Sequence, residues 1–161
     1  MHASAPLLAY TKGLTVGPQW KFTTRAVGLE KYQLRSIMVG AVPTMKRLCR
    51  EGRAESALCP CCHQEEESEE HMFLMCPAHT HIRHAEVRAE VWQHLPECLK
   101  LHGLVPQNLG LSKEDTLDLA GRIQYTLVDI LKHRGTFMPV ELQPRARWDE
   151  TQRRVRPRTS A

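Results

Sequence analysis

Aromatic side chains are scarce in this chain. They make up 6% of its 161 residues, and hydrophobic residues of all kinds make up 42%. These low values argue against a large, aromatic-rich core and favour a small helical core stabilised by a metal ion. No apolar run approaches the roughly 20 residues that a membrane-spanning helix needs, so the sequence predicts no membrane span.

Sequence motifs for catalysis are also missing. The chain has no Gly-x-Ser-x-Gly nucleophile motif and no glycine-rich phosphate loop. The aspartates at 115, 118 and 129 are spaced to lie along a helix surface rather than to gather into a carboxylate cluster. We therefore expect that the chain alone is not an enzyme.

Basic residues are concentrated at the two ends of the chain. Residues 1–53 carry nine Lys/Arg against two acidic groups, and residues 141–161 carry six Arg against three acidic groups. Residues 54–140 carry seven basic against thirteen acidic groups. Any contact with a polyanion is therefore expected at the ends. A solvated basic surface with no partner is the alternative.

The sequence predicts a mainly α-helical chain, because apolar residues recur at helical spacing and no strand pattern of any length is present. A helix is expected from residue 29, ended by Gly40 and Pro43. Its apolar side would comprise Leu29, Tyr32, Leu34, Ile37 and Met38. A short helix over 45–50 should follow, with Thr44 as its N-cap.

Two further helices are expected beyond the cysteine-rich middle. One covers 83–95 and stops at Pro96, with an apolar face of Val87, Val91, Trp92 and Leu95. Residues 98–111 are predicted to be a loop. Ser112 then caps the clearest helix, which Gly135 ends. Its apolar stripe comprises Leu117, Ala120, Ile123, Leu127, Ile130 and Leu131.

These patterns divide the chain into four parts. We expect an extended basic arm over 1–28, a helical zinc-binding domain over 29–96, and a loop with a long amphipathic helix packing on it over 97–135. Residues 136–161 are predicted to be a basic flexible tail. The arm lacks acidic groups before Glu30 and contains several Ser and Thr. It is therefore either a binding arm or an organelle-targeting segment.

Six cysteines are present, and they cluster with histidine rather than spreading as a disulfide framework would. The spacing Cys-x2-Cys-x8-His-x4-Cys predicts a closed tetrahedral site for one structural Zn²⁺. Its ligands are Cys59, Cys62, His71 and Cys76. Ser68 is placed to cap the helix that carries the last two ligands. The sequence thus predicts a CCHC knuckle-helix site, with two ligands in a tight turn (the knuckle) and two on the helix that follows.

Other choices of ligand stay open at this point. Cys61 can replace Cys62, although a Cys-x-Cys pair demands a tighter chelating turn. Four further histidines are reserve ligands: His63, His79, His81 and His84. The acidic run over 65–67 is most simply a solvated loop. A redox use of the Cys-x-x-Cys pair is the third alternative.

Two stretches around this site carry further motif residues. The first is Gly40-Ala41-Val42-Pro43-Thr44 followed by Arg47-Leu48, Arg50 and Gly52. The second is Cys59-Pro60-x-Cys62, Glu67, Glu70-His71, Cys76-Pro77 and Arg83. Together they resemble the reverse-transcriptase zinc-binding domain of non-LTR retrotransposon polyproteins. The resemblance covers about 34–92, and the two stretches stand in the family's order.

The resemblance implies a zinc module that helps a polymerase to hold template RNA or target DNA. Carried over by position, it assigns the same four zinc ligands and makes Lys46, Arg47 and Arg50 candidate phosphate contacts. The chain has no polymerase palm, because it lacks a Tyr-x-Asp-Asp motif and aspartates that could hold two magnesium ions. It therefore resembles a non-catalytic relative or remnant of the reverse-transcriptase C-terminal region.

The first functional hypothesis is a zinc-dependent module that binds the backbone of RNA or DNA. Its candidate contacts are Lys21, Arg25, Lys46, Arg47, Arg50, Arg153 and Arg154. Trp20 and Phe22 are candidates for base stacking. The alternative is a structural subunit of a larger protein or ribonucleoprotein assembly, with zinc used only for folding. An intracellular location, nuclear or organellar, is expected in either case.

Overall fold

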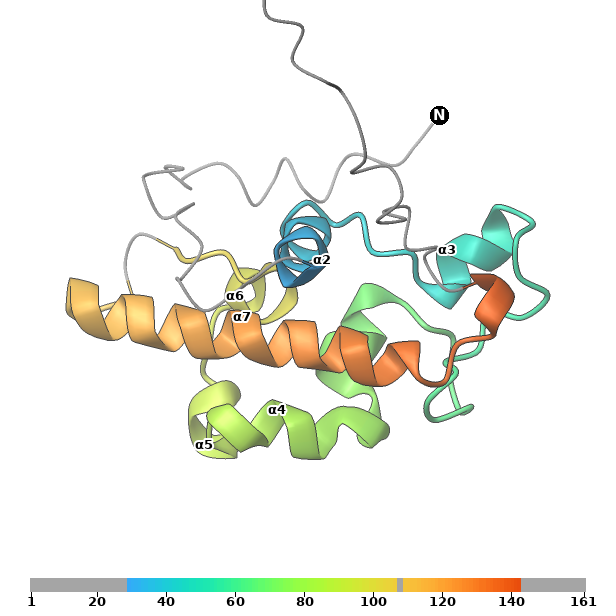
Figure 1. Ribbon diagram of the computed structural model, residues 1–161. Helices are drawn as coiled ribbons and strands as arrows, with labels where there is room; N and C mark the ends of the chain where they lie inside the picture. Colours follow the sequence, from blue (N-terminus) through green and yellow to red (C-terminus); the bar gives the residue numbers. More distant parts are fainter. Residues whose placement is uncertain (1–28, 107–108, 143–161) are drawn as a thin grey trace, which may run out of the picture.

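The computed structural model describes residues 29–106 and 109–142, which are mainly helical as predicted (Figure 1). In chain order the elements are α2 (Leu29–Met38), α3 (Met45–Arg50), the π-helix η2 (His71–Met75), the 3-10 helix η3 (Pro77–His79), α4 (Thr80–Glu86), α5 (Ala89–Trp92), α6 (Glu97–His102), α7 (Lys113–Gly135) and the 3-10 helix η4 (Val140–Leu142). Within these ranges β pairing is limited to one isolated antiparallel bridge, between Leu58 and Glu66. No helix of the described residues is long and apolar enough to cross a membrane.

The long helix α7 is the element on which the others pack. It contacts α2, α4 and α6, and Figure 1 shows α2 and α6 on one side of it and α4 with α5 on the other. Ser112 caps it as predicted, because its hydroxyl accepts the Asp115 N–H at 3.1 Å. The predicted stripe is buried from Ala120 to Ile130, but Leu131 is only half-buried and Leu117 is 44% exposed. The buried face therefore begins one turn later than expected.

Helix α2 has the predicted length but a narrower buried face. Ile37 is buried, whereas Tyr32 is 52% exposed and does not join the apolar side. Gly40 ends the helix with φ of 62°, and the Ala41 N–H donates to the Ser36 carbonyl at 2.8 Å. This arrangement is the αL termination that glycine permits at low cost. It turns the chain towards α3.

Helix α3 begins where predicted. The Thr44 hydroxyl accepts the Arg47 N–H at 3.3 Å, and Gly52 follows the helix with φ of 69°. Met45 and Leu48 are buried in a small cluster with Met138, which lies beyond the end of α7. Residues 138–142 therefore pack against α3, and Figure 1 shows η4 beside it.

The predicted helix over 83–95 is wrong in its bounds. The chain starts helix α4 already at Thr80 and breaks it at Val87, which is extended with φ of −131° and ψ of 119°. The separate helix α5 then carries Trp92 into the core, while Val91 is 38% exposed. The break lets both Val87 and Trp92 be buried, which outweighs the local preference for one continuous helix.

The loop predicted over 98–111 contains a helix. Helix α6 begins after Pro96 and ends at Gly103, which has φ of 64°. Its Leu99 is fully buried. A proline before a short stretch and a glycine after it are start and stop signals for a helix. Pro96 and Gly103 are therefore the local sequence signals for α6.

One main core joins the N-terminal, middle and C-terminal elements. Its buried members are Leu34, Ile37, Met38, Val42, Met72, Phe73, Val87, Trp92, Leu99, Ile123, Leu127, Val128 and Ile130. Met72 and Phe73 come from the segment between two of the predicted zinc ligands. The predicted metal segment is therefore built into the core rather than attached to its surface.

Candidate metal centre

The first two predicted ligands lie in a tight loop over 58–66, whose ends meet in the isolated β-bridge. The Cys59 N–H donates to the Glu65 carbonyl at 2.8 Å, and the His63 N–H donates to the Cys59 carbonyl at 2.9 Å. His63 has φ of 56°, in the left-handed region. These contacts hold the backbone of Cys59 and Cys62 in the compact shape of a chelating turn.

The other two predicted ligands bracket a π-helical turn. The Ser68 hydroxyl accepts the His71 N–H at 3.0 Å, as expected of a cap. The Cys76 N–H donates to the His71 carbonyl at 2.6 Å, five residues back. Residues five apart on an α-helix point about 140° away from each other. The wider π turn brings His71 and Cys76 towards the same side.

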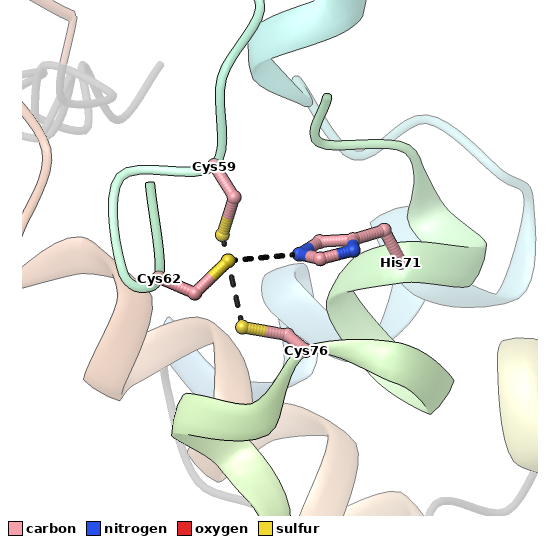
Figure 2. A group of neighbouring side chains, drawn as sticks. All are labelled: Cys59, Cys62, His71 and Cys76. Carbon is pink, nitrogen blue, oxygen red and sulfur yellow. Dashed lines mark hydrogen bonds between the residues drawn. The ribbon is translucent and has the colours of Figure 1, made fainter. Parts of the chain in front are cut away.

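The four predicted ligands come together in space (Figure 2). Cys59 and Cys76 are buried and their sulfurs lie 3.7 Å apart. The Cys62 sulfur lies 3.3 Å from Nε2 of His71. One ligand atom from each residue falls within 4.8 Å of every other, a group that could hold a metal ion.

The donor set and its spacing fit zinc. Four ligands around tetrahedral Zn²⁺, with Zn–S near 2.3 Å and Zn–N near 2.05 Å, have edges of roughly 3.8 Å between sulfurs and about 3.6 Å between sulfur and nitrogen. The observed separations of 3.7 and 3.3 Å are close to these values. Three sulfurs and one imidazole form the kind of closed set found in structural zinc sites.

The imidazole of His71 is oriented by a carboxylate. Its Nδ1 lies 3.1 Å from Oε2 of Glu65, while Nε2 faces the sulfurs. A histidine that ligates a metal commonly donates its second N–H to such a partner, which fixes the tautomer. Glu65 is therefore a supporting residue of the site, a role that sequence reasoning missed.

The thiols of the site differ in acidity. A hydrogen bond from the Cys61 thiol lowers the pKa of Cys59 to about 3 and raises the pKa of Cys61. Burial raises the pKa of Cys76 to about 12. Zn²⁺ binds each of these sulfurs as a thiolate, so its binding releases the protons that thiols such as Cys76 still hold and is stronger at higher pH.

A buried arginine holds the chain after the last ligand. Arg83 donates to the Cys76 carbonyl at 2.9 Å and to the Thr80 hydroxyl at 3.0 Å. Burial lowers the pKa of Arg83. Arg83, the last residue of the sequence motif, is therefore buried and supports the backbone that follows Cys76.

Glu67 contradicts the prediction of a solvated acidic loop. Glu65 and Glu66 are exposed, but Glu67 is fully buried. Its carboxylate pairs with Arg134 of α7 at 2.6 and 2.7 Å and accepts the Met45 N–H at 2.7 Å. The side chain thereby joins the chain after the metal loop to the start of α3 and the end of α7.

The predicted phosphate contacts divide into two groups. Lys46, Arg47 and Arg50 are exposed on α3. Lys46 pairs with Glu66 at 2.8 Å, and Arg47 pairs with Glu51 at 3.1 Å. The remaining candidates lie outside the described residues: Lys21, Arg25, Arg153 and Arg154, with the stacking candidates Trp20 and Phe22.

The reserve ligands stay outside the four-residue group. Cys61 groups instead with His79 and His133, whose ligand atoms lie within 4.8 Å of its sulfur and of each other. Sequence reasoning named the first two of these three residues but not His133, which lies 72 positions beyond Cys61. A pattern of spacing along the chain cannot find such a distant partner.

Residues 18–82 match the family model described as zinc-binding in reverse transcriptase. The match begins and ends earlier than the resemblance drawn from motifs alone, and it contains all four residues of the candidate site. No curated protein and no solved structure is significantly similar to the chain. The family match and the group of three cysteines and one histidine together support one structural Zn²⁺.

Proposed function

We propose that this reverse-transcriptase zinc-binding domain binds the phosphate backbone of RNA or DNA through the exposed side of α3, without catalysing a reaction. One observation carries the proposal. Lys46, Arg47 and Arg50 share the exposed side of a helix whose first N–H is held by buried Glu67. Three cations are thus presented on a rigid support, which suits backbone contact better than base reading.

In this proposal Cys59, Cys62, His71 and Cys76 all ligate one Zn²⁺, which supplies folding free energy rather than chemistry. Four protein donors leave no coordination position for an activated water. The role of the site is to hold the loop over 58–66 and the π turn in register with α3. Non-catalytic binding is therefore consistent with the absence of recognised catalytic motifs from the sequence.

The acidic neighbours of α3 do not prevent phosphate binding. The pairs of Lys46 with Glu66 and Arg47 with Glu51 are exposed to solvent. Exposed pairs of this kind contribute little net free energy, because solvent screens them. A phosphate can therefore replace either carboxylate at small cost, while it releases counterions from the nucleic acid.

The test is the salt dependence of binding to single- and double-stranded RNA and DNA oligonucleotides, measured by fluorescence anisotropy on zinc-loaded full-length protein. Replacing Lys46, Arg47 and Arg50 together by Gln should weaken binding to every oligonucleotide. It should also reduce the slope of log K against log salt by about 2–3, if all three residues contact phosphate.

A charge-matched control is available on other elements. Arg88, Lys113 and Arg122 are exposed and lie away from α3. Replacing these three by Gln removes the same charge and should leave affinity and slope nearly unchanged. Equal losses in both triple variants would contradict a binding side on α3. A wild-type protein that binds none of the oligonucleotides but co-migrates with a protein complex would favour the structural-subunit alternative.

A further inference from the structure

A second group of potential metal ligands lies beside the zinc site. It comprises Cys61 from the chelating loop, His79 from η3 and His133 from the last turn of α7. One ligand atom from each lies within 4.8 Å of the other two. The three residues come from separate segments, so the fold and not local spacing brings them together.

His79 has the hydrogen bonding of a metal ligand. It is fully buried, and its Nδ1 lies 2.9 Å from the Met72 carbonyl. Because a carbonyl only accepts, Nδ1 carries the proton and Nε2 keeps its lone pair. Nε2 is buried, and within the described part of the chain it has no hydrogen-bond partner. Donation of one ring N–H to a backbone carbonyl is how ligating histidines are usually held.

His133 offers a second unsatisfied nitrogen. Its Nδ1 is buried and finds no hydrogen-bond partner among the residues that the structure describes. The ring packs edge-on against that of His79, with centroids 5.3 Å apart, and is tilted against Phe137 at 5.1 Å. Buried polar atoms without partners are uncommon in proteins and call for an explanation, for which a bound ion is one candidate.

We propose that Cys61, His79 and His133 bind a second metal ion of the borderline-soft class, Zn²⁺ in the first instance. One thiolate and two imidazoles suit this class better than the hard ions Mg²⁺ and Ca²⁺, which prefer oxygen. Three protein donors leave one tetrahedral position for water. The Cys61 S–H bond breaks as the sulfur–metal bond forms, and its proton passes to solvent.

The second ion should bind after the first and more weakly. The first site has four donors at close to tetrahedral separations. The second has three donors instead of four, so it should hold its ion less tightly. Cys61 and His133 are also only half-buried, whereas Cys59 and Cys76 of the first site are fully buried.

Zinc titration of the full-length protein, followed by native mass spectrometry and by competition with a chromophoric chelator, tests the proposal. Wild type should take up two equivalents with separate affinities. Cys61→Ser and His133→Asn each remove a donor, so each should weaken the second equivalent by more than the about 10–100-fold that loss of a supporting residue costs, while the first equivalent stays bound. His94→Asn is the control, because His94 is exposed and outside the group.

Cobalt provides a readout of the donor atoms. The second equivalent of Co²⁺ should add sulfur-to-cobalt charge-transfer absorption in wild type, and this increment should be absent from Cys61→Ser. Uptake of a single equivalent by wild type would overturn the proposal. So would a second equivalent that persists in both variants, or loss of the first equivalent in Cys61→Ser, which would place Cys61 in the first site.

Discussion

The carboxylate of Glu67 and the guanidinium of Arg134 form a bidentate ion pair, although the residues are 67 positions apart in the sequence. The oxygen–nitrogen distances are 2.6 and 2.7 Å, and the side chains are 0% and 4% exposed. Arg134 also donates to the Pro43 carbonyl at 2.8 Å. The pair therefore links the end of α7 to the segment between the loop over 58–66 and the π turn. Through Pro43 it also links α7 to the start of α3.

Replacing Glu67 by Gln should destabilise the protein strongly. The change leaves the Arg134 charge buried without its counter-ion, and breaking a buried pair from one side costs about 3–5 kcal/mol. Urea unfolding of the zinc-loaded variant measures the loss. Glu66→Gln is the matched control, since Glu66 is the adjacent exposed partner of Lys46, and it should cost no more than about 1 kcal/mol. Similar losses in both variants would show that the pair with Arg134 adds nothing beyond a surface contact.

Glu65→Ala should weaken zinc binding without removing a ligand. Glu65 accepts from Nδ1 of His71 and so fixes the imidazole for coordination. Loss of such a supporting group commonly reduces metal affinity 10–100-fold. Because the Glu65 side chain is 70% exposed, we expect the lower end of that range, about tenfold. Chelator competition measures the change, with Glu66→Ala as control. An unchanged affinity in Glu65→Ala would argue against a role in orienting His71.

Glu69→Gln should stabilise the protein at neutral pH but not under acid conditions. Burial raises the pKa of Glu69 above its ordinary 4.5, so the folded chain holds this proton more tightly than the unfolded chain. The contribution of Glu69 to stability is therefore present below pH 4.5 and is lost as pH rises through the folded pKa. Glutamine keeps an oxygen to accept the Val42 N–H.

The measurement for Glu69 is the difference in unfolding free energy between variant and wild type across pH 4.5 to 7. The advantage of Glu69→Gln should grow with pH and then level off. Exposed Glu70 supplies the control, and Glu70→Gln should show a flatter difference. A Glu69→Gln advantage that is greatest at low pH has the wrong sign for a raised pKa and would refute this explanation.

Gly103→Ala should destabilise the protein more than Gly52→Ala. Both glycines have φ between 60° and 70°, so alanine is strained at either by about 1–2 kcal/mol. At Gly103 the added Cβ would also lie 3.0 Å from Cγ of Gln124 and 3.6 Å from Cδ1 of Leu127, whereas at Gly52 nothing lies within 4 Å. Thermal unfolding of the two variants isolates the cost of crowding. Equal decreases in Tm would show that Gln124 and Leu127 move aside at no measurable cost.

Local signals explain which helices could be predicted from the sequence. Helix α7 carries both a cap at Ser112 and a long apolar stripe, so its length was predictable. Helix α6 has six residues, too few to show a period, although Pro96 and Gly103 mark its ends. The break at Val87 has no local signal, because it depends on what the two flanking helices bury.

The candidate site was predictable to the extent that its residues are close in sequence. Spacing was enough to group the four cysteine and histidine residues. It could not show that the turn between His71 and Cys76 is π-helical, since that follows from bringing both side chains to one side. Nor could it distinguish Glu67 from its exposed neighbours, because the counter-ion Arg134 lies on a distant helix.

Zinc content and affinity of single-cysteine variants test the proposed ligand set most directly. Each full-length variant is purified without added zinc, and its tightly bound metal is measured by mass spectrometry. Cys62→Ser should lose the tight equivalent, as should Cys59→Ser and Cys76→Ser. Cys61→Ser should keep it, as should Cys49→Ser, because Cys49 belongs to neither group of potential ligands. Retention of tight zinc by Cys62→Ser together with its loss from Cys61→Ser would contradict the assignment of Cys59, Cys62, His71 and Cys76 as the structural zinc ligands.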